Sequence, residues 1–210
     1  MNEVDRAASE EQRQREPLSD RLRARTAAVL QPVGRFLAGL GIHPNTVTLV
    51  GFVLQTGVGA LFALGHGRWG GLLLLVVAPL DALDGAVARA GGNDSPFGAF
   101  LDSTVDRFSD AVLILGLTVH RYQEGLPLEV GLLMVALVAA LMVSYTRARA
   151  EALGLSCKVG LLTRMERILL IAVLSALGLF TVLVWALAIL SAVTVVQRVV
   201  HVYRACSSRE

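Results

Sequence analysis

No charged side chain occurs from Ile168 to Gln197, and this run limits what the chain can fold into. A helix crosses the hydrocarbon core of a bilayer with roughly 20 apolar residues. Residues 164–204 therefore hold two spanning helices joined by a tight turn near residues 179–183, or one very long helix. Hydrophobic residues make up 54% of the chain, whereas soluble globular domains contain about 45–50%. The sequence thus predicts an integral membrane protein.

Four more apolar segments precede this run, and short polar or glycine-rich turns separate them. They are predicted as helices that end near Leu64, run from Trp69 to Leu80, run from Phe97 to His120, and run from Leu128 past Arg149. Two helices in the last segment then give six spans in an all-α fold, with both termini on one side. Arg68 and Arg121 become the only basic residues on the opposite side, in agreement with the positive-inside rule. We therefore expect a multi-pass protein of the cell membrane with cytoplasmic termini.

The chain before the first span consists of a polar segment followed by an amphipathic one. Residues 1–17 are polar and charged without periodicity, which predicts a disordered tail. In residues 18–42 apolar side chains alternate with arginines, a pattern typical of an amphipathic helix on an anionic membrane surface. One face of a soluble helix would show the same pattern. We expect the membrane domain to span residues 43–204 and a short tail to follow at 205–210.

Acidic side chains cluster where the second apolar segment ends and the third begins. Asp81 and Asp84 share a helix face, and so do Asp102 and Asp106, because positions three or four apart lie on the same side. A short loop joins the two helices, so we expect the four carboxylates to converge near the cytoplasmic face. Placing four unpaired acids in a membrane would cost on the order of 10 kcal/mol. Bound cations offset that cost, and oxygen ligands favour two Mg²⁺ ions, with Mn²⁺ as an alternative.

The same segment has a specific spacing. It reads D-x2-D-G-x2-A-R-x8-G-x3-D-x3-D from Asp81 to Asp106. This resembles the signature of the CDP-alcohol phosphatidyltransferase family, with every fixed position present. The resemblance implies six transmembrane helices behind an amphipathic juxtamembrane helix, and a homodimer. It also implies transfer of a phosphatidyl group from CDP-diacylglycerol to a small alcohol, with release of CMP.

The resemblance further implies a role for each motif position. Metal ions would be bound by Asp81, Asp84, Asp102 and Asp106, and Asp106 would also be the general base for the acceptor hydroxyl. The CDP-lipid would contact residues of the motif, of the loop within it and of the segment before the first span: Gly85, Arg89, Ser95, Asn45, Thr46, Val47 and Thr48.

Arginines near the cytoplasmic ends of the later helices indicate which alcohol is used. Clustered guanidinium groups suit a phosphate, although flanking positive charge would place arginines there as well. The runs 148–151 and 195–198 resemble the bacterial phosphatidylinositol-phosphate synthases of this family, which typically have Lys at the position of Arg147. By this resemblance Arg147, Arg167 and Arg198 would hold the phosphate of an inositol phosphate. Glycerol 3-phosphate is the alternative acceptor.

Two other classes of membrane protein also place acids within the membrane. A cation transporter needs carboxylates spread along a path through the membrane, whereas these cluster at one depth. A non-catalytic lipid-binding protein has no use for the full set of metal ligands. We therefore expect an enzyme of phospholipid biosynthesis. Its partners would be CDP-diacylglycerol, a phosphorylated alcohol and membrane lipid, with no nucleic acid.

Overall fold

The computed structural model describes residues 30–92 and 95–207, apart from the side chain of Asp81. The predicted tail at residues 1–17 and the first part of the predicted amphipathic helix lie outside these ranges. Within them every regular element is a helix: α3 (Pro44–Ala63), α4 (Gly67–Val77), η1 (Ala78–Ala82), α5 (Leu83–Gly91), α6 (Pro96–Gln123), α7 (Pro127–Ala152), α8 (Arg164–Ala176) and α9 (Phe180–Ser207). The 3-10 turn η1 joins α4 to α5 without a break, so these three form one rod.

The helices begin and end close to the residues that the sequence predicts. Pro44 and Pro96 stand in the first turns of α3 and α6, where the missing N–H costs nothing. The turn between α8 and α9 falls at residues 177–179, slightly before the predicted position. Gly178 allows it because its φ is +75°, a conformation that other residues rarely adopt. The last apolar run is therefore two helices and not one.

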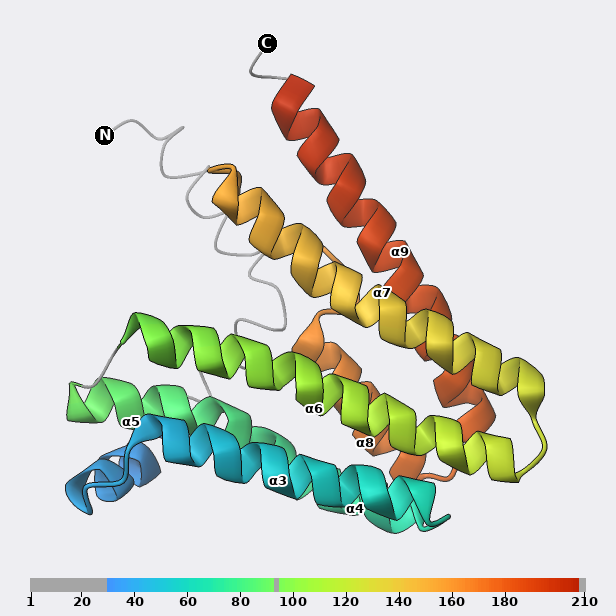
Figure 1. The fold of residues 1–210 in the computed structure, drawn as a ribbon, viewed down its shortest axis with the longest axis horizontal. Coiled ribbons are helices and arrows are strands. Elements are labelled where there is room, and N and C mark those ends of the chain that lie inside the picture. The colour runs from blue at the N-terminus through green and yellow to red at the C-terminus, as the bar shows by residue number, and fades with distance from the viewer. Residues whose placement is uncertain (1–29, 93–94, 208–210) are drawn as a thin grey trace, which may run out of the picture.

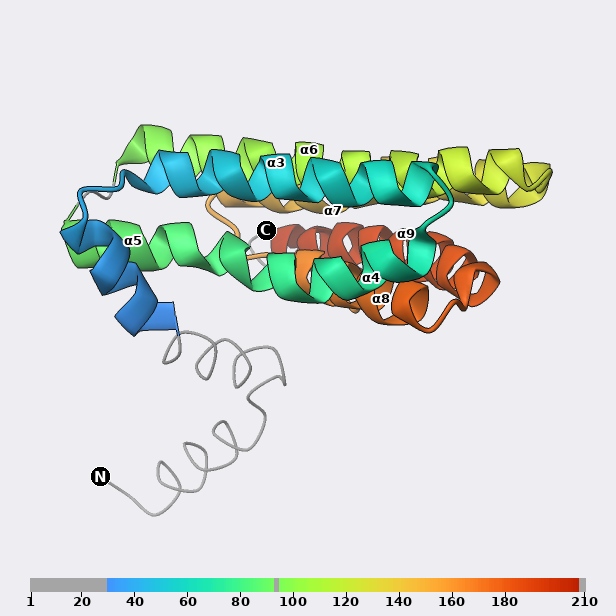
Figure 2. The same ribbon diagram turned by 90° about the horizontal axis from the view of Figure 1, so that it is seen from below.

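The helices pack in two layers. Figure 2 shows α3, α6 and α7 in one layer and the α4–η1–α5 rod, α8 and α9 in the other. Within the layers α3 contacts α6, α6 contacts α7, α4 contacts α8 and α8 contacts α9, while α3–α4 and α7–α9 contacts join the two. Toward one end of the molecule α7 and α9 diverge from α3 and α6 (Figure 1). The starts of α3 and α6 and the ends of α7 and α9 lie toward this end (Figure 1).

The core lies where the two layers face each other. Close backbone approach is possible because of glycines: a Cβ at Gly116 of α6 would lie 2.2 Å from the Gly59 carbonyl oxygen of α3. A Cβ at Gly71 of α4 would lie 2.3 Å from a backbone nitrogen of α8. Such contacts are typical of helices packed in lipid. The surrounding buried cluster draws on six helices and includes Phe62, Leu74, Leu113, Leu133, Ile171 and Leu183.

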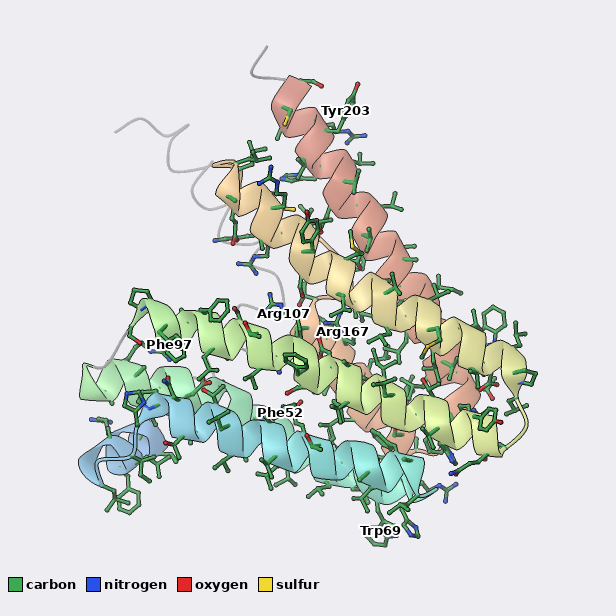
Figure 3. All side chains as sticks on the ribbon, viewed as in Figure 1. Phe52, Trp69, Phe97, Arg107, Arg167 and Tyr203 are labelled. Carbon is green, nitrogen blue, oxygen red and sulfur yellow. The ribbon has the colours of Figure 1, made fainter. Side chains whose placement is uncertain are left out.

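Four helical rods in the described part of the chain are long and apolar enough to cross a membrane. The other two long helical segments differ: α6 has 28 residues but carries the charges of the motif, and α8 has 13 residues. Exposed Trp69 and Tyr203 lie toward opposite ends of the molecule (Figure 3), as aromatic residues do at the two membrane interfaces. The architecture fits a multi-pass membrane protein. The four rods are Pro44–Ala63, Gly67–Gly91, Pro127–Ala152 and Phe180–Ser207.

A further helix over residues 30–39 precedes α3. Leu30 joins Leu83 and Ala86 of α5 in a small buried cluster. In Figure 2 this helix projects from the two layers beside α5. It is the described part of the predicted amphipathic helix at 18–42, and its position on a membrane surface stays a prediction.

Candidate active site

A cavity of about 500 Å³ opens where the starts of α3 and α6 meet α5. The two motif helices and the segment 45–48 were expected to meet at this site, and the structure places that segment in the first turns of α3, which forms a third wall. The cavity collects predicted metal ligands and predicted CDP-lipid contacts in one place. Its lining residues are Pro44, Asn45 and Thr48 of α3, Asp84, Gly85 and Ala88 of α5, and Ser95, Pro96, Gly98, Ala99 and Asp102 at the start of α6.

Two helices begin at the wall of this cavity. His43 caps α3, because its Nδ1 accepts a hydrogen bond from the Asn45 N–H at 3.2 Å. Ser95 caps α6, because its Oγ accepts from the Gly98 N–H at 3.0 Å. The first turn of a helix has N–H groups without intrahelical partners and carries partial positive charge. Two such ends at one cavity favour an anion such as a phosphate group.

Two hydrogen bonds orient the Asp84 carboxylate. Thr48 Oγ1 donates to Oδ2 at 2.7 Å, and the Gly85 N–H donates to Oδ1 at 2.6 Å. The residue is buried, with 8% of its surface exposed. Thr48 therefore positions a predicted metal ligand, a role that the motif spacing does not reveal because Thr48 and Asp84 are 36 residues apart.

The two predicted carboxylates of α6 face different neighbours. Asp102 lines the cavity, whereas Asp106, one turn further along the helix, is not among its lining residues. Arg164 of α8 approaches Asp106 instead, with its Nη2 2.9 Å from Oδ1. Asp106 thus lies between the cavity and the arginines of α8.

The donor atoms suit a hard divalent cation in kind, because Asp84 and Asp102 both present carboxylates to the cavity. Among the described side chains, no group of three or more His, Cys, Asp or Glu lies close enough together to hold a metal ion. The predicted ligand Asp81 is not one of those side chains. The structure therefore brings two members of the predicted set to one cavity, and the complete set stays a prediction.

The predicted CDP-lipid contacts divide into those that line the cavity and those that do not. Thr46 is exposed, and Val47 packs against the small cluster that Leu30 forms with Leu83 and Ala86 of α5. Arg89 lies beside Gly85, since a Cβ at Gly85 would come within 3.2 Å of its Nη1. The glycine leaves room for this guanidinium next to the cavity. The members that line the wall are Asn45, Thr48, Gly85 and Ser95.

Asp106, Asp110, Arg164 and Arg167 form a chain of alternating charges between α6 and α8, here named the Arg167 cluster. Arg167 donates from Nη2 to Oδ2 of Asp110, and Arg164 Nε lies 3.9 Å from Asp110 Oδ1. Arg167 and Asp110 are buried, with 0% and 3% of their surfaces exposed. Figure 3 shows Arg167 near the start of α8, from which it reaches Asp110 of α6.

The sequence-based prediction included Asp106 and Arg167 but missed the pairing of Asp110 with α8. The sequence did contain one sign of this pairing, in the spacing of the acids and of the arginines. Asp106 and Asp110 are four residues apart, and Arg164 and Arg167 are three apart, so each pair lies on one helix face. The pattern did not reveal that the two faces meet.

The other two predicted acceptor-binding arginines lie on α7 and α9. Arg198 is buried and donates to a backbone carbonyl of α7 and, at 2.9 Å, to the Val159 carbonyl. Arg147 is exposed and pairs with Glu151 at 2.8 Å. Arg198 lies within electrostatic range of both Arg147 and Arg167. Three helices therefore bring positive charge into one region.

The model of the CDP-alcohol phosphatidyltransferase family matches residues 41–197. The chain belongs to this family. The resemblance drawn from the motif is confirmed, and the protein is a transferase. The matched region includes all the predicted site residues except Arg198, which follows its last residue.

Curated relatives align over most of the chain. The archaetidylinositol phosphate synthase of Pyrococcus horikoshii is 39% identical over 180 residues, which cover 85% of this chain and 93% of the relative. The phosphatidylinositol phosphate synthase of Corynebacterium glutamicum is 38% identical over 182 residues, covering 82% and 83%.

Solved structures agree with the fold. Mycobacterium tuberculosis phosphatidylinositol phosphate synthase with CDP-DAG bound has a TM-score of 0.78 and 31% identity, over 84% of this chain and 94% of that one. The same enzyme in complex with manganese and citrate gives a TM-score of 0.75 at 31% identity, over 83% and 88%. The predicted all-α fold is confirmed, and the manganese complex supports the use of divalent metal in the family.

Proposed function

We propose that this chain transfers a phosphatidyl group from CDP-diacylglycerol to an inositol phosphate, with release of CMP, in phospholipid biosynthesis. The observation that carries the proposal is the cavity where Asp84 and Asp102 of the motif meet two helix N-termini. Carboxylates that hold a cation, beside N–H groups that favour an anion, suit a metal-bound diphosphate. The names of the relatives, and the relative with CDP-DAG bound, support the same substrates.

The transfer makes one bond and breaks one bond at the phosphorus that bears the lipid. A hydroxyl oxygen of the inositol phosphate attacks this phosphorus, the hydroxyl proton passes to the Asp106 carboxylate, and the bond to CMP breaks. Asp106 suits the role of base because it lies between the cavity and the arginines of α8. The Asp106 carboxylate would thus contact the acceptor hydroxyl while the phosphate of the acceptor binds near those arginines.

We further propose that Asp81, Asp84, Asp102 and Asp106 hold two divalent cations, Mg²⁺ or Mn²⁺. Bound cations neutralise the charge that develops on the diphosphate during transfer. Thr48 and the Gly85 N–H hold Asp84 in place for this purpose. Binding of Mn²⁺, followed by electron paramagnetic resonance, checks the site independently of turnover. Replacing Asp84 with Asn should weaken that binding.

The substrate contacts are proposed in two groups. The CDP-lipid is contacted from α3, α5 and the cap of α6, and the acceptor phosphate from α7, α8 and α9. Arg198 already donates two hydrogen bonds to backbone carbonyls, so its contribution would come from its remaining donors and its charge. The residues are Asn45, Thr46, Val47, Thr48, Gly85, Arg89 and Ser95 for the CDP-lipid, and Arg147, Arg167 and Arg198 for the phosphate.

The proposed arrangement in the membrane follows from charge. We propose six spans within a transferase domain at residues 43–204, with the amphipathic helix at 18–42 on the surface. The positive-inside rule then places the site on the cytoplasmic face of the cell membrane. A homodimer is the assembly that the family resemblance implies.

An acceptor screen tests the proposed function. Purified protein in nanodiscs receives CDP-diacylglycerol and Mg²⁺, and CMP release is followed with inositol 1-phosphate, glycerol 3-phosphate, free inositol and serine. Release with inositol 1-phosphate alone is the expected result. Release with glycerol 3-phosphate instead would keep the reaction and change the acceptor. No release by folded protein with any acceptor would contradict the proposal and favour a transport or lipid-binding role.

A further inference from the structure

The Arg167 cluster contains donors that the protein itself does not use. Arg167 is fully buried, yet its Nε and Nη1 have no hydrogen-bond partner among the described residues. Buried guanidinium donors without partners are costly and uncommon. Only Nη2 is satisfied, by Asp110. The unused donors therefore point to a ligand, and a phosphate has several acceptor oxygens that could accept from them.

Asp110 contacts both arginines of α8. One oxygen accepts from Arg167 and the other lies 3.9 Å from Arg164 Nε. Because Asp110 is itself buried, with 3% of its surface exposed, its two partners have little freedom to leave it. Arg164 extends the chain to Asp106, 2.9 Å from Nη2. The geometry thus connects the Arg167 guanidinium to the Asp106 carboxylate through two intermediate charges.

We propose that Asp110 and Arg164 are positioning residues for the transfer reaction. Asp110 fixes the Arg167 guanidinium so that its free donors receive the acceptor phosphate. Arg164 fixes the Asp106 carboxylate relative to that phosphate. The carboxylate is thereby held within hydrogen-bond reach of the acceptor hydroxyl. This inference rests on the proposed function, which assigns Asp106 as the base and Arg167 as a phosphate ligand.

Kinetic constants of Asp110→Asn test the inference. The matched control is Glu129→Gln, which also converts a buried, arginine-paired carboxylate into an amide, but where the end of α6 meets the start of α7. For D110N we expect the KM for inositol 1-phosphate to rise and kcat to fall, each by roughly 10-fold or more, with the KM for CDP-diacylglycerol within about 2-fold. D110E should recover part of the loss. E129Q should leave all three constants within about 2-fold.

A second variant keeps the test decisive if D110N does not fold. Arg164→Gln leaves the Asp110–Arg167 hydrogen bond in place and removes the contact of Arg164 with Asp106, together with its weaker 3.9 Å contact with Asp110. We expect kcat to fall roughly 10-fold, with the acceptor KM within about 2-fold. If D110N and R164Q lose thermal stability but keep the wild-type kinetic constants, as the control E129Q should, the positioning role is wrong while the proposed function stands. Wild-type protein that transfers to no phosphorylated alcohol would overturn both this inference and the proposed function.

Discussion

Two buried ion-pair clusters contact α6, one at its middle and one at its C-terminal end, and they differ in how completely their donors are satisfied. In the Arg121 cluster, Arg121 donates from Nε to Glu129 at 2.6 Å, from Nη1 to Glu124, and from Nη2 to Thr181 at 3.1 Å. Thr181 in turn donates to Glu129 at 3.0 Å. In the Arg167 cluster, two nitrogens of a fully buried Arg167 have no hydrogen-bond partner among the described residues.

Under the proposed function, this difference distinguishes a cluster that only stabilises the fold from one that binds substrate. A closed network holds helix ends together and has nothing left to offer a ligand. The Arg121 cluster joins the end of α6 to the starts of α7 and α9 in this way. An incomplete network costs stability, which a protein tolerates where a substrate completes it. Substitutions at the proposed site should therefore impair transfer or substrate binding, whereas substitutions in the Arg121 cluster should lower only stability.

Replacing Asp106 with Asn should remove most of the transfer activity. The amide keeps the size of the side chain but cannot accept the hydroxyl proton. Loss of a general base typically lowers the rate about 10²- to 10⁴-fold. CMP release measures the effect, and equilibrium binding of CDP-diacylglycerol should change little. Wild-type turnover in D106N would remove Asp106 from the role of base.

Replacing Glu129 with Gln should lower stability and spare the chemistry. Removing one partner of a buried ion pair leaves the Arg121 charge less well compensated, and such changes cost about 3 kcal/mol. Thermal unfolding in detergent measures the loss. Transfer at a temperature where the variant is folded should match that of the wild type. A raised acceptor KM would show that the Arg121 cluster is not purely structural.

Replacing Arg167 with Gln should weaken use of the acceptor. The variant loses the charge and the fork of donors, so we expect the KM for inositol 1-phosphate to rise roughly 10- to 100-fold. Arg167→Lys keeps the charge without the fork and should lie between the variant and the wild type. The counterpart Arg121→Gln should leave that KM unchanged. Equal acceptor KM values for R167Q and the wild type would contradict the proposed phosphate site.

Thr48 and Thr181 offer the smallest and most closely matched comparison. Each hydroxyl donates to a carboxylate, Thr48 to Asp84 at 2.7 Å and Thr181 to Glu129 at 3.0 Å. Replacement by Val removes one hydrogen bond, worth about 1 kcal/mol. T48V should weaken Mn²⁺ binding a few-fold, whereas T181V should lower only the unfolding temperature. Identical Mn²⁺ affinities for T48V and the wild type would show that Thr48 does not tune the metal site.

Local sequence patterns determined the helical membrane fold, most helix ends and the family motif. The uncharged run at 168–197 required membrane helices, and the helical repeat placed Asp81 with Asp84 and Asp102 with Asp106 on common faces. The prolines, caps and glycines near the helix ends predicted where most helices begin and end. The family signature also lies in one short segment, so no tertiary information was needed to recognise it.

Tertiary packing decided which of these faces meet. Thr48 reaches Asp84 across 36 residues, and Arg167 reaches Asp110 across 57. Helical periodicity gives the direction of a side chain around its own axis but carries no information about the neighbouring helix. Here the glycine contacts between α3 and α6 and between α4 and α8 set how the helices pack. Only that packing makes α3 the third wall of the cavity and completes the chain of charges from Asp106 to Arg167.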